Sequence, residues 1–80
     1  MKTVWILTRE SVQLGRYGKQ IIGVFTNRKD AIEELESVKK DFHGTGTVTI
    51  DTTTSYEILT PGQVRYYCIE QHQMREWEAK

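Results

Sequence analysis

The residues with the greatest chemical reactivity in this sequence are one cysteine and two histidines. Cys68 and His72 are four residues apart, which places them on one side of either a strand or a helix, and His43 is the other histidine. A zinc site needs paired ligands at short, repeated spacings, and a cysteine nucleophile needs a histidine that a third group holds in place. The sequence offers neither pattern. We therefore interpret Cys68 as a small packing residue and predict no catalytic residue, no metal site and no cofactor.

A second candidate is the segment 15–19, which reads Gly-Arg-Tyr-Gly-Lys. It lacks the serine or threonine and the spacing of a P-loop. A Gly-x-x-Gly segment clamps a nucleic-acid backbone between two helices, whereas the flanks here have strand-like patterns. We interpret residues 11–19 as a polar hairpin loop. Its tip, with Arg16, Tyr17 and Lys19, is a small basic and aromatic candidate contact for a partner, and the alternative is an ordinary hairpin tip with a turn that glycine permits.

A third candidate is a set of carboxylates at helical spacing: Asp30, Glu33, Glu34 and Asp41. At 100° per residue, Asp30, Glu34 and Asp41 project from one flank of a helix, with Glu33 beside them. Such a flank suits a basic groove of a partner protein, including a groove that normally holds nucleic acid. The alternative is an ordinary solvated helix face with no partner.

Adjacent tyrosines form the fourth candidate. Tyr66 and Tyr67 lie in a strand-like run, so their side chains point to opposite faces and one of them must leave the core. An exposed aromatic residue on a sheet suits either base stacking or a protein interface. Because three glutamates offset the two arginines nearby in the sequence, we favour protein binding over nucleic-acid binding.

The composition of the whole chain narrows the function further. Eleven Lys and Arg residues balance eleven Asp and Glu residues, so the chain lacks the basic excess of a general polyanion binder. Hydrophobic residues make up 38% of the 80 residues and charged residues 28%, which is typical of one small globular core. No apolar run approaches the length of a membrane span, and the start lacks the pattern of a signal peptide. We expect a single domain over residues 1–80, in a reducing cytoplasm and without membrane contact.

The elements that must position these residues follow from the hydrophobic periodicity. Apolar runs predict strands over residues 2–10 and 20–26, paired antiparallel, with a bulge or close backbone approach at Gly23. A helix is predicted over 28–42, with Asn27 as its N-cap residue. Its buried side carries apolar residues at helical spacing: Ala31, Leu35, Val38 and Phe42.

The second half of the chain has strand patterns throughout. Residues 46–58 alternate with a period of two, which predicts one long half-buried strand or two strands broken near 52–55. Pro61-Gly62 is a turn signal, and residues 63–71 form a further strand. Met74 and Trp77 suggest a short C-terminal helical turn. The predicted fold is α+β: a four-stranded antiparallel sheet with one helix packed across one face, in the order β-β-α-β-β.

Two strings in the first half are similar to a known family. They are Val4-Trp5-Ile6-Leu7-Thr8-Arg9-Glu10 and Ile22-Gly23-Val24-Phe25-Thr26-Asn27 followed by Asp30-Ala31. They resemble a family of small uncharacterised bacterial and phage domains, over about the first 42 residues. The resemblance implies a strand hairpin that runs into a helix, and a mobile-element context. The second half departs from that family, which has no established activity, so the resemblance assigns no functional residue.

Two functional hypotheses follow. The first is a small non-enzymatic protein-binding module, an accessory protein of a phage or mobile element that inhibits a host defence protein such as a nucleic-acid-targeting complex. The alternative is a single-stranded nucleic-acid-binding domain that uses Tyr66 or Tyr67 together with Arg16. The sequence leaves a homodimer open in either case.

Overall fold

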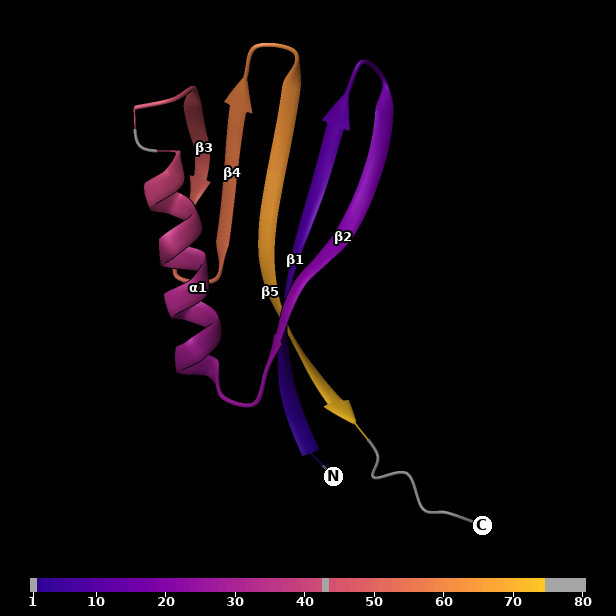
Figure 1. Cartoon of the computed structure of the whole chain (residues 1–80), viewed down its shortest axis with the longest axis vertical. Helices are drawn as coiled ribbons and strands as arrows, with labels where there is room; N and C mark the ends of the chain where they lie inside the picture. Colours follow the sequence, from indigo (N-terminus) through magenta and orange to yellow (C-terminus); the bar gives the residue numbers. More distant parts are fainter. Residues whose placement is uncertain (1, 43, 75–80) are drawn as a thin grey trace.

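The computed structural model describes residues 2–42 and 44–74. Its elements are β1 (Lys2–Gln13), β2 (Arg16–Phe25), α1 (Arg28–Asp41), β3 (Thr47–Asp51), β4 (Ser55–Thr60) and β5 (Gln63–Met74). The five strands form one antiparallel sheet in the order β2-β1-β5-β4-β3 (Figure 1). The fold is α+β, as predicted. The described residues contain no helix that is long and apolar enough to cross a membrane.

The hairpin of β1 and β2 is longer than the sequence pattern predicts. The turn contains two residues, Leu14 and Gly15, with φ angles of 52° and 78°. Two consecutive positive φ angles match the right-handed twist of the flanking strands, so pairing continues up to the turn. The predicted loop over 11–19 is therefore wrong, and Arg16 and Tyr17 are strand residues paired with β1.

A bulge in β2 lies where the sequence predicts it. The β1–β2 register shifts between Leu7 and Thr8, next to Gly23. A side chain at Gly23 would approach the Phe25 ring to 2.9 Å, which explains the glycine. In a regular strand, residues three apart point to opposite faces. Ile22 and Phe25 are three apart, yet both pack against the core, because the bulge adds one residue to β2 and so brings Phe25 to the same face as Ile22.

The segment 46–58 folds as two strands, so the four-stranded prediction is wrong. The order is β-β-α-β-β-β, with a turn over residues 52–54 between β3 and β4. The Thr52 backbone N–H donates to the Ser55 carbonyl at 2.8 Å, and the Thr52 hydroxyl reaches the same oxygen at 3.4 Å. A threonine run favours strands, but threonine hydroxyls also stabilise turns. The period-two pattern of the sequence therefore continues through the turn between β3 and β4 and does not reveal it.

The side-chain alternation of β3 is interrupted as well. The register of β3 with β4 shifts between Val48 and Ile50. As a result Val48 lies opposite Ile58, on the helix side of the sheet, whereas Ile50 lies opposite Glu57, on the other side. The period of two predicted over residues 46–58 would place Val48 and Ile50 on one face, but the bulge shifts that period by one residue and separates them.

The helix begins and ends within one residue of its predicted bounds. The Asn27 side-chain oxygen accepts a hydrogen bond from the Asp30 backbone N–H at 2.8 Å, which confirms the predicted N-cap. Ala31 and Leu35 are fully buried. Val38 and Phe42 pack against the same core from the last turns of the helix.

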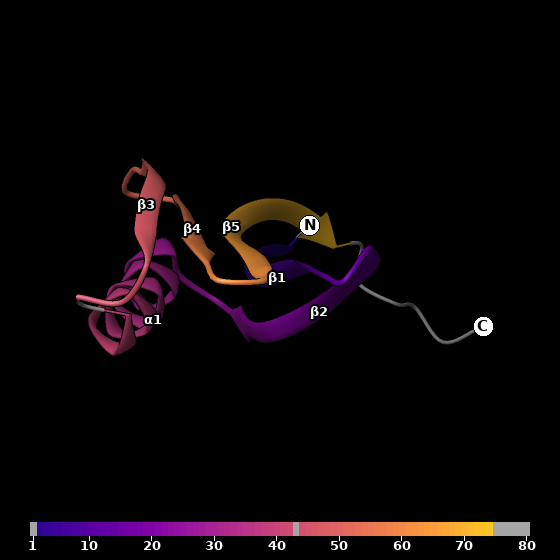
Figure 2. The same cartoon turned by 90° about the horizontal axis from the view of Figure 1, so that it is seen from above.

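The core lies between α1 and one face of the sheet (Figure 2). Its buried members are Leu7, Ala31, Leu35, Tyr56, Ile58, Tyr67 and Ile69. Figure 1 shows that the closed ends of the β1–β2 and β4–β5 hairpins extend beyond the end of the helix. Among residues 2–42 and 44–74, no helix lies over the opposite face of the sheet. The structure therefore presents an uncovered sheet face, which we call the open face.

Candidate functional site

The open face carries a continuous apolar row near the closed ends of the hairpins. Residues directly opposite each other on neighbouring antiparallel strands project from the same face. Tyr17 of β2 lies opposite Val12 of β1, Val12 lies opposite Val64 of β5, and Val64 lies opposite Leu59 of β4. Four strands therefore place four apolar side chains side by side on this face.

Exposed apolar side chains are concentrated on the open face. By their pairing, six of the large hydrophobic residues that are exposed in the described part of the chain belong to it: Val12, Tyr17, Ile21, Val24, Ile50 and Leu59. The side chains of β2 are the most open, with Tyr17 63%, Ile21 61% and Val24 57% exposed. Val12, Tyr17 and Leu59 belong to the apolar row, whereas Ile21 and Val24 lie on the far side of Lys19 along β2. A gathering of exposed apolar side chains on one face marks an interaction site.

Beside the apolar row, the open face is acidic. The next row across the strands contains Lys19, Glu10, Tyr66 and Glu57 in that order. The Lys19 ammonium is shared between Glu10, at 3.7 Å, and Glu70, at 3.5 Å, and the charge of Glu70 raises the pKa of Lys19. Glu57 accepts a hydrogen bond from the Thr49 hydroxyl at 2.7 Å and has no ion pair among the described residues. This part of the open face thus carries the carboxylates of Glu10, Glu57 and Glu70 and the ammonium of Lys19.

The helix side of the same hairpin ends is basic instead. Arg9, Arg16 and Arg65 all project there, because they alternate with the residues of the open face. Strands β1, β2 and β5 place no carboxylate on that side within the described residues. The Arg65 guanidinium lies over the Phe42 ring, 5.4 Å from its centroid. The Arg9-Glu10 alternation in β1 is the sequence signal that could have revealed these two oppositely charged faces.

The two adjacent tyrosines occupy opposite faces, as predicted. Tyr67 is only 4% exposed and packs in the core, with its ring centroid 6.0 Å from that of Phe42. Tyr66 projects from the open face between Glu10 and Glu57. Of the two residues, only Tyr66 is placed to contact a partner.

The predicted basic and aromatic tip does not exist as one surface. Arg16 and Tyr17 are consecutive strand residues, so Tyr17 joins the open face and Arg16 joins the opposite one. The nucleic-acid hypothesis combined Arg16 with Tyr66 or Tyr67. Arg16 and Tyr66 project from opposite faces of the sheet, and Tyr67, on the same side as Arg16, is buried in the core.

The helix carboxylates form a separate surface. Asp30, Glu33, Glu34 and Asp41 are all exposed on α1, whose other side packs against the sheet. Asp30 also accepts a hydrogen bond from the Asn27 side-chain amide at 2.9 Å, so it supports the helix N-terminus. The structure does not bring this acidic flank together with the open face.

Cys68 and His72 lie on β5 with Glu70 between them. Four residues of extended chain separate them by roughly 13 Å, which is too far for two ligands of one metal ion. The His72 side chain is instead 3.5 Å from the Glu70 carboxylate. His43 and Trp77 lie outside the described residues, whereas Met74, which the sequence pattern placed in a C-terminal helical turn, is the last residue of strand β5.

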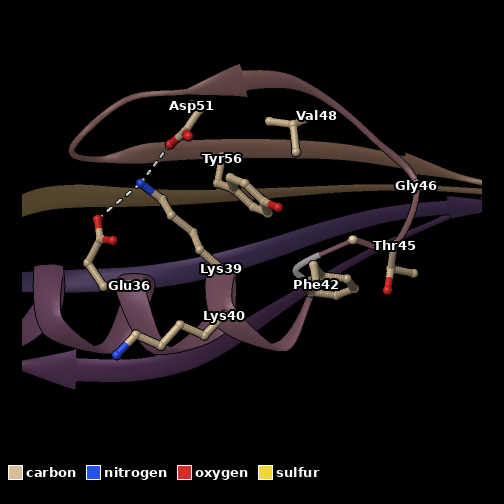
Figure 3. Close-up of a pocket in the computed structure, with 10 residues that line it drawn as sticks. Glu36, Lys39, Lys40, Phe42, Thr45, Gly46, Val48, Asp51 and Tyr56 are labelled. Atoms are coloured by element: carbon tan, nitrogen blue, oxygen red, sulfur yellow. Dashed lines mark hydrogen bonds and ion pairs between the residues drawn. The ribbon is translucent and has the colours of Figure 1, made fainter.

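A pocket of about 580 Å³ lies where the C-terminal part of α1 faces β3 and β4 (Figure 3). Its central polar group is the Lys39 ammonium, which is 3.1 Å from the Glu36 carboxylate, 2.8 Å from the Asp51 carboxylate and 2.9 Å from the Thr52 carbonyl. These three contacts use all three donors of the ammonium. Lys39 therefore ties α1 to the edge of the sheet, and the structure gives it no free donor for a ligand.

Tyr56, which also lines this pocket, should make the fold sensitive to alkali. Burial raises the pKa of Tyr56, and the nearby Asp51 charge adds to the effect. A pKa raised in the folded state gives stability that is complete below the ordinary tyrosine pKa and is lost as the pH rises above about 10. Urea denaturation at a series of pH values should show this fall. Tyr56→Phe should reduce it, and an equal fall in both proteins would contradict the assignment.

Comparisons of the chain with protein-family models, curated proteins and solved structures find no match. The resemblance of the first half to small bacterial and phage domains stays a prediction from the sequence.

Proposed function

We propose that this chain is a small non-enzymatic protein-binding module that contacts its partner through the open face. The observation that carries the proposal is the gathering of six exposed apolar side chains on that one face. Interfaces of this kind combine an apolar and aromatic centre with a polar surround. The open face has both, because Tyr17 and the valines lie beside the charged row, which itself contains Tyr66.

The charges of the open face favour a protein partner over a nucleic acid. Tyr66 would be the stacking residue on this face, but Glu10 and Glu57 lie directly opposite it on the two neighbouring strands. Carboxylates in these positions repel the phosphates that dominate nucleic-acid affinity. A basic protein surface suffers no such repulsion.

The resemblance of the first half suggests what the partner does. A phage or mobile-element accessory protein acts in the host cytoplasm, and an acidic face complements a host protein that holds nucleic acid in a basic groove. The inhibited partner in this proposal is a host defence protein of that kind. This chain would inhibit that protein by covering its basic groove with the acidic open face.

A second candidate function rests on the helix side of the hairpin ends. Arg9, Arg16 and Arg65 could contact phosphates there without interference from carboxylates of their own strands. Fluorescence anisotropy with a labelled single-stranded oligonucleotide tests this function. Binding should then fall steeply with salt and weaken in Arg9→Gln and Arg65→Gln proteins. An absence of binding at low salt removes the candidate.

The test of the proposed function compares two surface variants. The open-face variant carries Ile21→Ser and Val24→Ser, two positions that are more than half exposed, so folding should be little affected. The helix variant carries Glu34→Lys and Asp41→Lys, which reverse the acidic flank of α1. Each is used to capture proteins from a nuclease-treated lysate of the source organism. We expect the wild type and the helix variant to retain the same protein, and the open-face variant to retain about tenfold less.

Other outcomes contradict the proposal in distinct ways. If the helix variant fails to capture a protein that the wild type and the open-face variant both retain, the interface lies on α1. Capture of nucleic acid alone, in the absence of nuclease, favours the second candidate. Sedimentation would reassign the open face to a second copy of this chain if the wild type is a dimer and the open-face variant a monomer. Melting curves of all variants serve as the control for folding.

A further inference from the structure

The open face contains a depression of about 340 Å³ near the closed ends of the hairpins. All five strands contribute to its lining. Val12 and Val64 supply apolar walls, Tyr17 and Tyr66 supply aromatic rings, and two glutamates supply charge. The depression therefore combines apolar surface, aromatic rings and negative charge in one place.

The register sets the position of each charge. Tyr66 occupies the central strand β5, with Glu10 directly opposite on β1 and Glu57 directly opposite on β4. Neighbouring strands are about 4.8 Å apart, so the backbones of the two glutamates are roughly 10 Å apart with the tyrosine between them. A cation placed over the Tyr66 side chain would have one carboxylate on each side.

The charge of the depression is only partly compensated within the described residues. Lys19 is shared between Glu10 and Glu70 at 3.7 and 3.5 Å, so one ammonium serves two carboxylates. Glu57 has a neutral partner, the Thr49 hydroxyl. The depression thus keeps a negative charge that a cationic side chain of a partner could neutralise.

Resting on the proposed function, we propose that this depression binds an arginine side chain of the partner protein. The aliphatic stem packs on the valines, the guanidinium stacks on Tyr66, and its N–H groups donate to Glu57 and Glu10. Arginine fits better than lysine, because its planar group stacks on aromatic rings, forms forked hydrogen bonds to carboxylates and is more weakly hydrated. Arginine is also enriched at protein interfaces.

The experiment uses short peptides as defined probes. The first is acetylated and amidated Thr-Val-Arg-Val-Thr, and the others replace its central arginine with lysine, glutamate or citrulline, which keeps the shape of arginine without its charge. Each is titrated into the isotope-labelled chain and followed by NMR. We expect the arginine peptide to shift the amide signals of Glu10, Glu57 and Tyr66, and to bind about tenfold more tightly than the citrulline peptide.

Two variants locate the effect. Glu57→Gln should bring the arginine peptide to the affinity of the citrulline peptide, because it removes the carboxylate that has no ion pair within the described part of the chain. Glu33→Gln removes one exposed carboxylate from α1 and should change nothing.

Several results would overturn the arginine site. Equal affinity for the arginine and citrulline peptides at the open face would reject the site and leave the proposed function standing. A preference for arginine that survives Glu57→Gln would also reject it, as would the absence of binding by every peptide. The proposed function is rejected by a different result: the variant with Ile21→Ser and Val24→Ser captures as much of the partner protein as the wild type does.

Discussion

Replacing Leu35 with alanine should lower the free energy of unfolding by about 2–5 kcal/mol. Leu35 has no exposed surface and lies in the middle of α1, in contact with the core that the sheet supplies. Truncation removes buried methyl groups and leaves a cavity that the neighbouring side chains fill only in part. An 80-residue domain has a total stability of roughly 4–12 kcal/mol, so the loss is a large share of it. Urea denaturation monitored by circular dichroism measures it directly.

Leu59→Ala provides a matched control, because the same atoms are deleted from a different environment. Leu59 lies on the open face and is 39% exposed. Its truncation should lower stability by less than about 1 kcal/mol. Equal losses for Leu35→Ala and Leu59→Ala would mean that both faces of the sheet are equally covered, which contradicts the structure. Leu59→Ala should instead weaken partner binding.

Gly46→Ala should destabilise the protein by about 3 kcal/mol or more, because two effects act at one position. Gly46 precedes β3 and has a φ angle of 77°, in the left-handed region that disfavours side chains. An added Cβ would also collide with the backbone oxygen of Leu59 in β4, which cannot move without disturbing the pairing of the two strands. Thermal and urea unfolding should both show the loss.

Gly44→Ala separates the two effects. Gly44 has a similar φ angle of 75°, but a side chain there would meet nothing within 4 Å. Its substitution should therefore lower stability by only about 1–2 kcal/mol, the amount expected from the backbone conformation alone. If Gly44→Ala and Gly46→Ala lower stability equally, the close approach of residue 46 to β4 contributes nothing to the loss of stability in Gly46→Ala.

The features that could be predicted from the sequence are those that depend on near neighbours in the chain. The cap at Asn27 and the buried positions of Ala31 and Leu35 follow from the period of one helix turn. The bulge at Gly23 was also visible, because a glycine within an apolar strand run marks such a site. Each signal involves residues that are a few positions apart, so no tertiary contact is needed to interpret it.

The functional residues could be predicted only in part. Adjacent tyrosines in a strand must separate, so the sequence predicts that one of them leaves the core, and Tyr66, which is half-buried on the open face, is that residue. Arg16 and Tyr17 were expected to act together as a loop tip, but the tight turn at Leu14 and Gly15 extends the strands and sends them to opposite faces. The length of the turn decides whether Arg16 and Tyr17 belong to a loop or to a strand. A polar segment with two glycines is compatible with turns of several lengths.

By itself, the sequence determined an α+β chain with a capped helix after a strand hairpin, since local periodicity and capping suffice for these elements. Only the tertiary structure decided that residues 46–58 reverse near Thr52, since a threonine run suits a strand and a turn equally well. The tertiary structure also decided which strands are neighbours. The acidic depression depends on that choice, because Glu10 and Glu57 are 47 positions apart and meet across Tyr66 only when β1, β5 and β4 lie side by side.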